Sequence, residues 1–143
     1  MISELELKQL DELQHIADIE ECVKIVTGSD NPFFLLECAQ LYNWDDGFDV
    51  VNAIANNKHC ELSIGLSLFW LADAVSYLTG EIVRNEYNSE WAEFCEILIS
   101  RIESGEYKCG ILSFDPQLGK VEKYKLRKLG IPEVFLNEVE VEK

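Results

Sequence analysis

The stretch Tyr42-Asn43-Trp44-Asp45-Asp46-Gly47-Phe48, together with the apolar run from Leu62 to Leu78, decides the fold of this chain. One helical pattern ends within the first stretch and another begins after Gly47. An aspartate side chain accepts hydrogen bonds from the free N–H groups of a first helical turn, so Asp45 and Asp46 are expected to cap the second helix. A glycine relieves backbone crowding at such a turn. The stretch therefore predicts a turn followed by a short helix over about residues 47–56.

The run from Leu62 to Leu78 is apolar on nearly every side, which predicts one helix that is buried all round. Gly65, Ala72 and Ser76 fall near one stripe of this helix and would let a neighbouring helix approach closely. A membrane span is the alternative, but it needs about 20 apolar residues, and three serines and an aspartate interrupt this run. We therefore expect a core helix and no membrane partner.

Composition indicates one globular domain over residues 1–143. Hydrophobic residues make up 48% of the chain and charged residues 27%, which is typical of folded proteins and not of disordered ones. The net charge of −15 argues against nucleic acid as a partner, because phosphates would be repelled. It favours a basic protein partner, although it also fits an acidic protein whose charge serves only solubility.

The cysteines do not form a recognisable framework. No two of them make a CxxC pair, and the count is odd: Cys22, Cys38, Cys60, Cys95 and Cys109. The N-terminus enters an acidic helical pattern directly, without the pattern of a signal peptide. We therefore expect reduced, mostly buried thiols and a cytoplasmic location.

The remaining segments predict further helices. Ser29 or Asp30 is expected to cap a helix that has Pro32 in its first turn. A helix is expected from about Asn88 to Ile102. Residues 107–129 carry a net charge of +4 and fit either a small C-terminal β-hairpin or a helix over 120–129, with the helix favoured, and residues 131–136 should pack onto the domain. The expected fold class is all-α: a compact bundle of five to six helices around a buried central helix.

No motif in the chain indicates catalysis. His59 beside Cys60 is a weak metal signal, because adjacent ligands without a second pair do not make a typical zinc site. The acids after Asn43 fail as a calcium loop, because the positions that need glycine and glutamate hold Phe48 and Ile54. We expect no enzymatic activity, no metal and no cofactor. The alternative is a small hydrolase or metal-dependent enzyme that uses the Asp45/Asp46/His59 region.

Several short motifs support a family resemblance. They are the stretch from Tyr42 to Phe48, then Ala53-Ile54, Asn57, His59-Cys60 and Leu68-Phe69-Trp70-Leu71-Ala72-Asp73. Together they cover about residues 40–75 and resemble the core of a bacterial domain family of unknown function. Members of that family resemble immunity proteins of bacterial polymorphic toxin and contact-dependent inhibition systems.

The resemblance implies an immunity protein that binds and neutralises a cognate toxin domain. The negative charge suits a basic toxin and a fast, electrostatically steered association. The expected partner-binding residues are Asp45, Asp46, Asp49 and Glu61, and acids within residues 86–96 form the alternative patch. A helical adaptor module is a further alternative to the immunity function.

Overall fold

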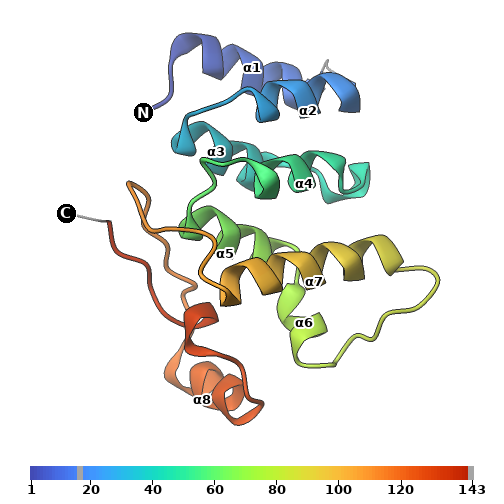
Figure 1. Cartoon of the computed structure of the whole chain (residues 1–143), viewed down its shortest axis with the longest axis vertical. Coiled ribbons are helices and arrows are strands. Elements are labelled where there is room, and N and C mark those ends of the chain that lie inside the picture. The colour runs from blue at the N-terminus through green and yellow to red at the C-terminus, as the bar shows by residue number, and fades with distance from the viewer. Residues whose placement is uncertain (16–17, 142–143) are drawn as a thin grey trace.

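The helices are stacked in layers along the long axis of the molecule, in the order of the sequence (Figure 1). The computed structural model describes residues 1–15 and 18–141. Helices α1 and α2 form the first layer, α3 and α4 the second, and α5, α6 and α7 the third, while α8 lies at the far end. Their bounds are α1 Glu4–His15, α2 Ile19–Thr27, α3 Pro32–Leu41, α4 Asp49–Asn56, α5 Leu62–Leu71, α6 Ala74–Leu78, α7 Ser89–Glu103 and α8 Lys120–Lys128.

The predicted all-α fold class is confirmed, but the predicted number of helices is too low. The described residues contain eight α-helices and no strand. Residues 120–128 form helix α8, so the hairpin alternative for residues 107–129 is wrong. The one β-type pairing among the described residues is an isolated bridge, in which Phe114 and Val139 exchange backbone hydrogen bonds of 3.0 and 2.8 Å.

The predicted single central helix is divided into α5 and α6 at Asp73. The backbone of Asp73 is left-handed, with φ of 56°, a conformation that ends a helix and that aspartate tolerates better than most residues. The indole Nε1 of Trp91 donates to the carbonyl of Ala72 at 2.7 Å, and the Asp73 carboxylate accepts from the Ser76 hydroxyl at 2.8 Å. The indole therefore satisfies a carbonyl that would accept a backbone hydrogen bond in a continuous helix. The predicted burial holds for Ser63 through Phe69 of α5.

One hydrophobic cluster runs through all the layers, from Leu10 of α1 to Val139 near the C-terminus. Helix α2 packs on α4, α3 packs on α5, and α5 packs on α7. Gly65 of α5 admits a close neighbour, because a Cβ atom at this position would lie 2.8 Å from the ring of Tyr107. The small residue was predicted to admit a neighbouring helix, and its nearest neighbour is instead an aromatic ring from a loop.

Asparagine side chains tie the layers together where the loops meet. The Asn57 amide donates to the carbonyls of Val26 and Ser29, both at 3.0 Å, and its oxygen accepts from the backbone N–H of His59 at 2.8 Å. Asn31 is the N-cap of α3, and its side chain accepts from the N–H of Phe33 at 3.1 Å. Pro32 follows as the first residue of α3, as predicted, but the predicted cap is wrong.

Ser29 lies two residues, and Asp30 one residue, before Asn31, so neither can serve as the N-cap of α3. Ser29 instead bonds to the two asparagines. Its hydroxyl accepts from the Asn31 N–H at 3.2 Å, and its carbonyl accepts from Asn57.

We predict that Asn57→Ala lowers the free energy of unfolding by about 2–3 kcal/mol, because three hydrogen bonds are lost at once, although the Val26 carbonyl keeps the one from the Ser29 N–H. The measurement is urea denaturation followed by circular dichroism. The matched control is the neighbouring variant Asn56→Ala, whose exposed side chain makes no bond within the described residues. It should change stability by no more than about 0.5 kcal/mol. Equal midpoints for the two variants would contradict the role assigned to Asn57.

Candidate functional site: an acidic protein-binding edge

The turn from Tyr42 to Phe48 is built by its polar and aromatic residues, and the predicted aspartate caps are wrong. Asn43 caps the short 3₁₀ turn Trp44–Asp46, and its side-chain oxygen accepts from the N–H of Asp45 at 3.1 Å. Phe48 occupies the N-cap position of α4 and makes no side-chain cap bond. Gly47 has φ of 89°, which explains why a glycine stands at this position.

The aromatic residues of the turn anchor it to α7. The Trp44 ring lies 5.6 Å from that of Tyr42 and 5.9 Å from that of Phe94, both in edge-to-face geometry. Phe94 of α7 is buried, and it also contacts Phe48 at 5.4 Å. Trp44 therefore packs between the turn and α7. The turn is thereby fixed to a helix that lies about 50 residues later in the sequence.

The three aspartates of this region have free carboxylates. Asp45, Asp46 and Asp49 are all exposed, and none of them bonds through its side chain to another described residue. Asp49 is the first residue of α4, where the positive end of the helix dipole favours a negative charge. These three carboxylates therefore do not help to hold the turn together.

Acids of α2 join the aspartates of the turn. Burial raises the pKa of Cys22, and the charges of Asp18, Asp46 and Glu21 raise it further. Burial likewise raises the pKa of Tyr42 to about 12, with contributions from Asp46 and Asp49. Acids that act on the same groups lie near one another. Glu20 lines the same groove as Asp49, and Asp45 adjoins Asp46 in the turn. We call the whole set the acidic edge: Asp18, Glu20, Glu21, Asp45, Asp46 and Asp49.

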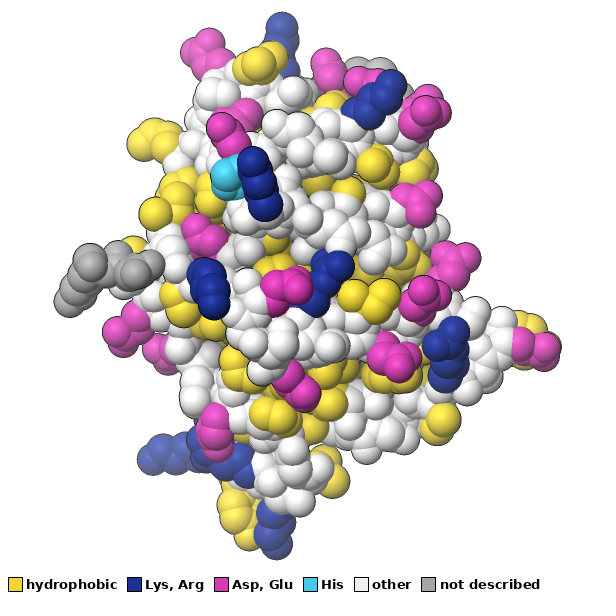
Figure 2. Space-filling model, viewed as in Figure 1, with side chains coloured by type: hydrophobic (Ala, Val, Ile, Leu, Met, Phe, Trp, Pro, Cys, Tyr) yellow, Lys and Arg dark blue, Asp and Glu magenta, His cyan; other side chains and the backbone are white. Residues whose placement is uncertain are grey.

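Figure 2 shows how charge is distributed over one face of the molecule. Acidic side chains are spread along the stacked layers with single lysines and arginines among them, and a further group of basic side chains is found at the far end, where α8 lies. The acids near the N-terminus were expected only as part of an acidic helical pattern, apart from the turn. The sequence signal that could have joined them to it is helical spacing, which places Glu20 beside Ile19 and Val23, the apolar residues of α2 that line the groove with α4.

Glu61 lies apart from the other predicted contact residues. It precedes α5, at the opposite end of α4 from Asp49. Its carboxylate accepts from the backbone N–H groups of Leu112 at 3.0 Å and Ile111 at 3.2 Å. A Cβ atom at Gly110 would lie 2.6 Å from this carboxylate, so the loop approaches closely. The side chain of Glu61 holds the loop after α7 in place.

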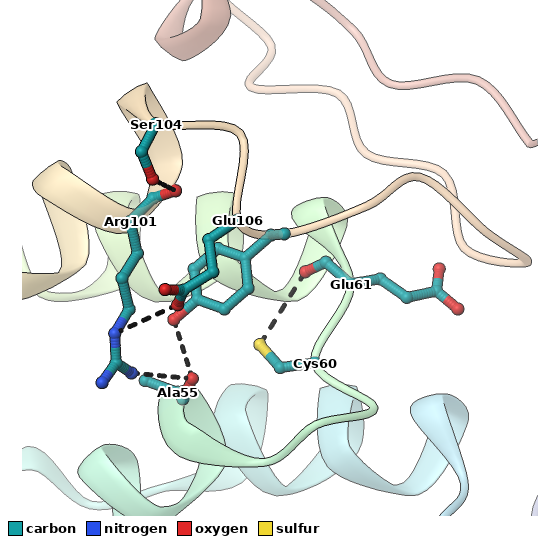
Figure 3. Close-up of polar contacts among 7 residues, drawn as sticks. Ala55, Cys60, Glu61, Arg101, Ser104 and Glu106 are labelled. Carbon is teal, nitrogen blue, oxygen red and sulfur yellow. Dashed lines mark hydrogen bonds and ion pairs between the residues drawn. The ribbon is translucent and has the colours of Figure 1, made fainter.

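The C-terminal end of α4 is held by α7 and the loop that follows it (Figure 3). The carbonyl of Ala55 accepts from the hydroxyl of Tyr107 at 2.8 Å and from the guanidinium of Arg101 at 3.1 Å. Arg101 is also paired with Glu106 at 3.3 Å. These contacts fix the second layer to the third, and so fix the acidic edge at the other end of α4.

The residues of the enzyme alternative do not converge. Asp45 and Asp46 precede α4 and His59 follows it, and the eight residues of this helix span about 12 Å. Among the described residues, no three His, Cys, Asp or Glu side chains are grouped so that they could hold a metal ion. Burial raises the pKa of Cys38, Cys60 and Cys95 to about 12, so these thiols are protonated at neutral pH.

A family model described as a domain of unknown function, DUF4274, matches residues 30–103. No curated protein and no solved structure matches the chain. None of the helices in the described ranges is both long enough and apolar enough to span a bilayer.

We predict that Glu61→Gln lowers stability, whereas the triple variant Asp45→Asn/Asp46→Asn/Asp49→Asn leaves it nearly unchanged. The amide of Glu61→Gln would place a donor against a backbone donor, which should cost about 2 kcal/mol in urea denaturation. The triple variant removes repelling, unbonded charges and should change stability by less than about 0.5 kcal/mol. An unchanged midpoint for Glu61→Gln would show that this carboxylate does not hold the loop.

We also predict that only one thiol of the native protein reacts rapidly with Ellman's reagent at pH 8. Cys109 is exposed, whereas the other four cysteines are buried. The expected time course is a fast phase for one thiol and a slow phase for four, with all five reacting rapidly in denaturant. Cys109→Ser should abolish the fast phase. A second fast-reacting thiol in that variant would contradict the burial described above.

Proposed function

We propose that this chain, which belongs to the DUF4274 family of domains of unknown function, is an immunity protein that binds and neutralises a basic toxin domain. The observation that carries the proposal is the acidic edge. Asp18 caps α2 through the N–H of Glu21, but the other five carboxylates of the edge are exposed and make no side-chain bond within the described part of the chain. Unpaired surface charge of one sign is of little use to folding, because like charges repel. It speeds association with a protein of the opposite charge.

The rigidity of the edge supports a binding role. Trp44 and its aromatic neighbours fix the turn that carries Asp45 and Asp46, and Arg101 and Tyr107 fix the helix that carries Asp49. Carboxylates that are already held in place lose little conformational freedom on binding, and this favours affinity. The chain would neutralise its partner by covering an active site or an adjacent surface of the toxin. Five cysteines that form no disulfide fit action in the cytoplasm.

A helical adaptor module is the second candidate function. The layered stack of α1/α2, α3/α4 and α5/α7 has the arrangement of helical repeat proteins, which bind other proteins through the faces of their helices. This candidate predicts a partner that is not toxic. The enzyme alternative has no such observation in its favour, since its residues lie at opposite ends of α4.

The proposed function is tested by growth rescue. The product of the gene next to the one that encodes this chain is expressed in a susceptible host, with and without this chain, and the two proteins are then purified together. We expect the neighbour to stop growth and this chain to restore it by forming a stable complex. A harmless neighbour, or rescue without a complex, would contradict the proposal, and a complex with a harmless neighbour would favour the adaptor.

The acidic edge is tested in the same complex with two variants of equal charge. Asp45→Asn/Asp46→Asn/Asp49→Asn should slow association about tenfold at low salt, and the difference should shrink at high salt. The matched control is Glu86→Gln/Glu90→Gln/Glu93→Gln, which removes the same charge from the alternative patch at α7. A larger effect of the control would place the binding surface on α7 instead.

A further inference from the structure

A groove runs between α2 and α4 on the same side of the stack as the acidic edge. Its volume of about 680 Å³ lies within the range of roughly 300–1,000 Å³ that is typical of ligand sites. Ile19 and Val23 of α2 and Ala53 of α4 supply an apolar floor, and all three are only partly buried. Glu20 and Asp49 add negative charge to its wall. The groove therefore offers both an apolar surface and charges that attract lysine and arginine.

Two asparagines of α4 line this groove and have no bonding role in the chain. Neither the Asn52 nor the Asn56 side chain bonds to another described residue, whereas the adjacent Asn57 makes three hydrogen bonds. Asparagine is a poor helix former, and Asn52 stands in the middle of a helix of eight residues. Their amides, each with two donor hydrogens and one acceptor oxygen, are free to bind another molecule.

The spacing of the two amides matches that of an extended peptide. Residues i and i+4 of a helix are about 6 Å apart along its axis, and two residues of an extended chain span about 6.6 Å. Each amide can accept from a backbone N–H and donate to a backbone carbonyl. Asn52 and Asn56 can therefore contact every second residue of a strand-like segment that lies along α4.

We infer that the groove between α2 and α4 binds an extended polypeptide segment in which an apolar side chain is flanked by lysine or arginine. The amides of Asn52 and Asn56 hold its backbone, Ile19 and Val23 contact the apolar side chain, and Glu20 and Asp49 pair with the basic ones. This inference rests on the proposed function, because it names the part of a basic partner protein that the acidic edge receives.

The inference is tested by selection from a phage library of random dodecapeptides on the immobilised full chain. We expect enriched peptides that combine an apolar residue with flanking basic residues. By fluorescence polarisation, they should bind Asn52→Ala/Asn56→Ala about tenfold more weakly than the unchanged protein. Alanine is a better helix former than asparagine, so this variant should fold. The matched control is Gln40→Ala, which removes an exposed amide of α3 beside α5 and should bind as the unchanged protein does.

Two results would overturn the inference: no enrichment above a library panned on the double variant, or enriched peptides that bind the double variant and the unchanged protein equally. The proposed function fails separately. A neighbouring gene product that binds the double variant with full affinity leaves the immunity function standing and rules out the groove. If the peptides bind through the two asparagines but the neighbouring gene product is harmless, the groove is supported as a peptide-binding site and neutralisation of that gene product is ruled out.

Discussion

The side chain of Asn57 is the constraint on which the arrangement of the first two layers depends. Its amide bonds to the end of α2 and to the loop after it, and its oxygen bonds to its own loop. The C-terminal ends of α2 and α4 are thereby held at a fixed distance. Both helices are short, so fixing one end of the pair also fixes the other, where Asp18 and Asp49 begin the two helices. The position of the acidic edge follows from a hydrogen-bonded amide at the opposite end of the layer.

Periodicity and local rules predicted the parts of the fold that are decided within one segment. The buried helix from Leu62, the helix at residues 120–128 and the proline at the start of α3 all follow from such rules. The break at Asp73 did not, because it depends on an indole from α7 that takes the carbonyl of Ala72. The capping role of Asn43 was also missed, because two neighbouring aspartates have the same preference for a cap and only the backbone decides between them.

The candidate site was predictable to the extent that it is local. Asp45, Asp46 and Asp49 are neighbours in the sequence, and the structure places them together at one exposed edge. Glu61 has the same chemistry, yet its carboxylate is bonded to a loop some 50 residues further on, and no spacing rule connects these segments. The acids of α2 show the opposite case, since they are distant from the turn in sequence but lie near Asp46 in space. The sequence shows which residues carry charge, but only the packed structure shows which charged side chains are bonded within the chain and which can bind a partner.

The contact between Glu61 and Leu112 has a consequence for the order in which the chain can fold during synthesis. The two residues are 51 positions apart, and a contact of this separation carries a high entropic cost of loop closure. The layers built from α1 to α4 consist of consecutive segments and need nothing from the later part of the chain for their mutual packing. The bonds that hold the start of α5 can form only when residues 111 and 112 have left the ribosome. The apolar surface of α5 is therefore covered later in synthesis than the surfaces between α1, α2, α3 and α4.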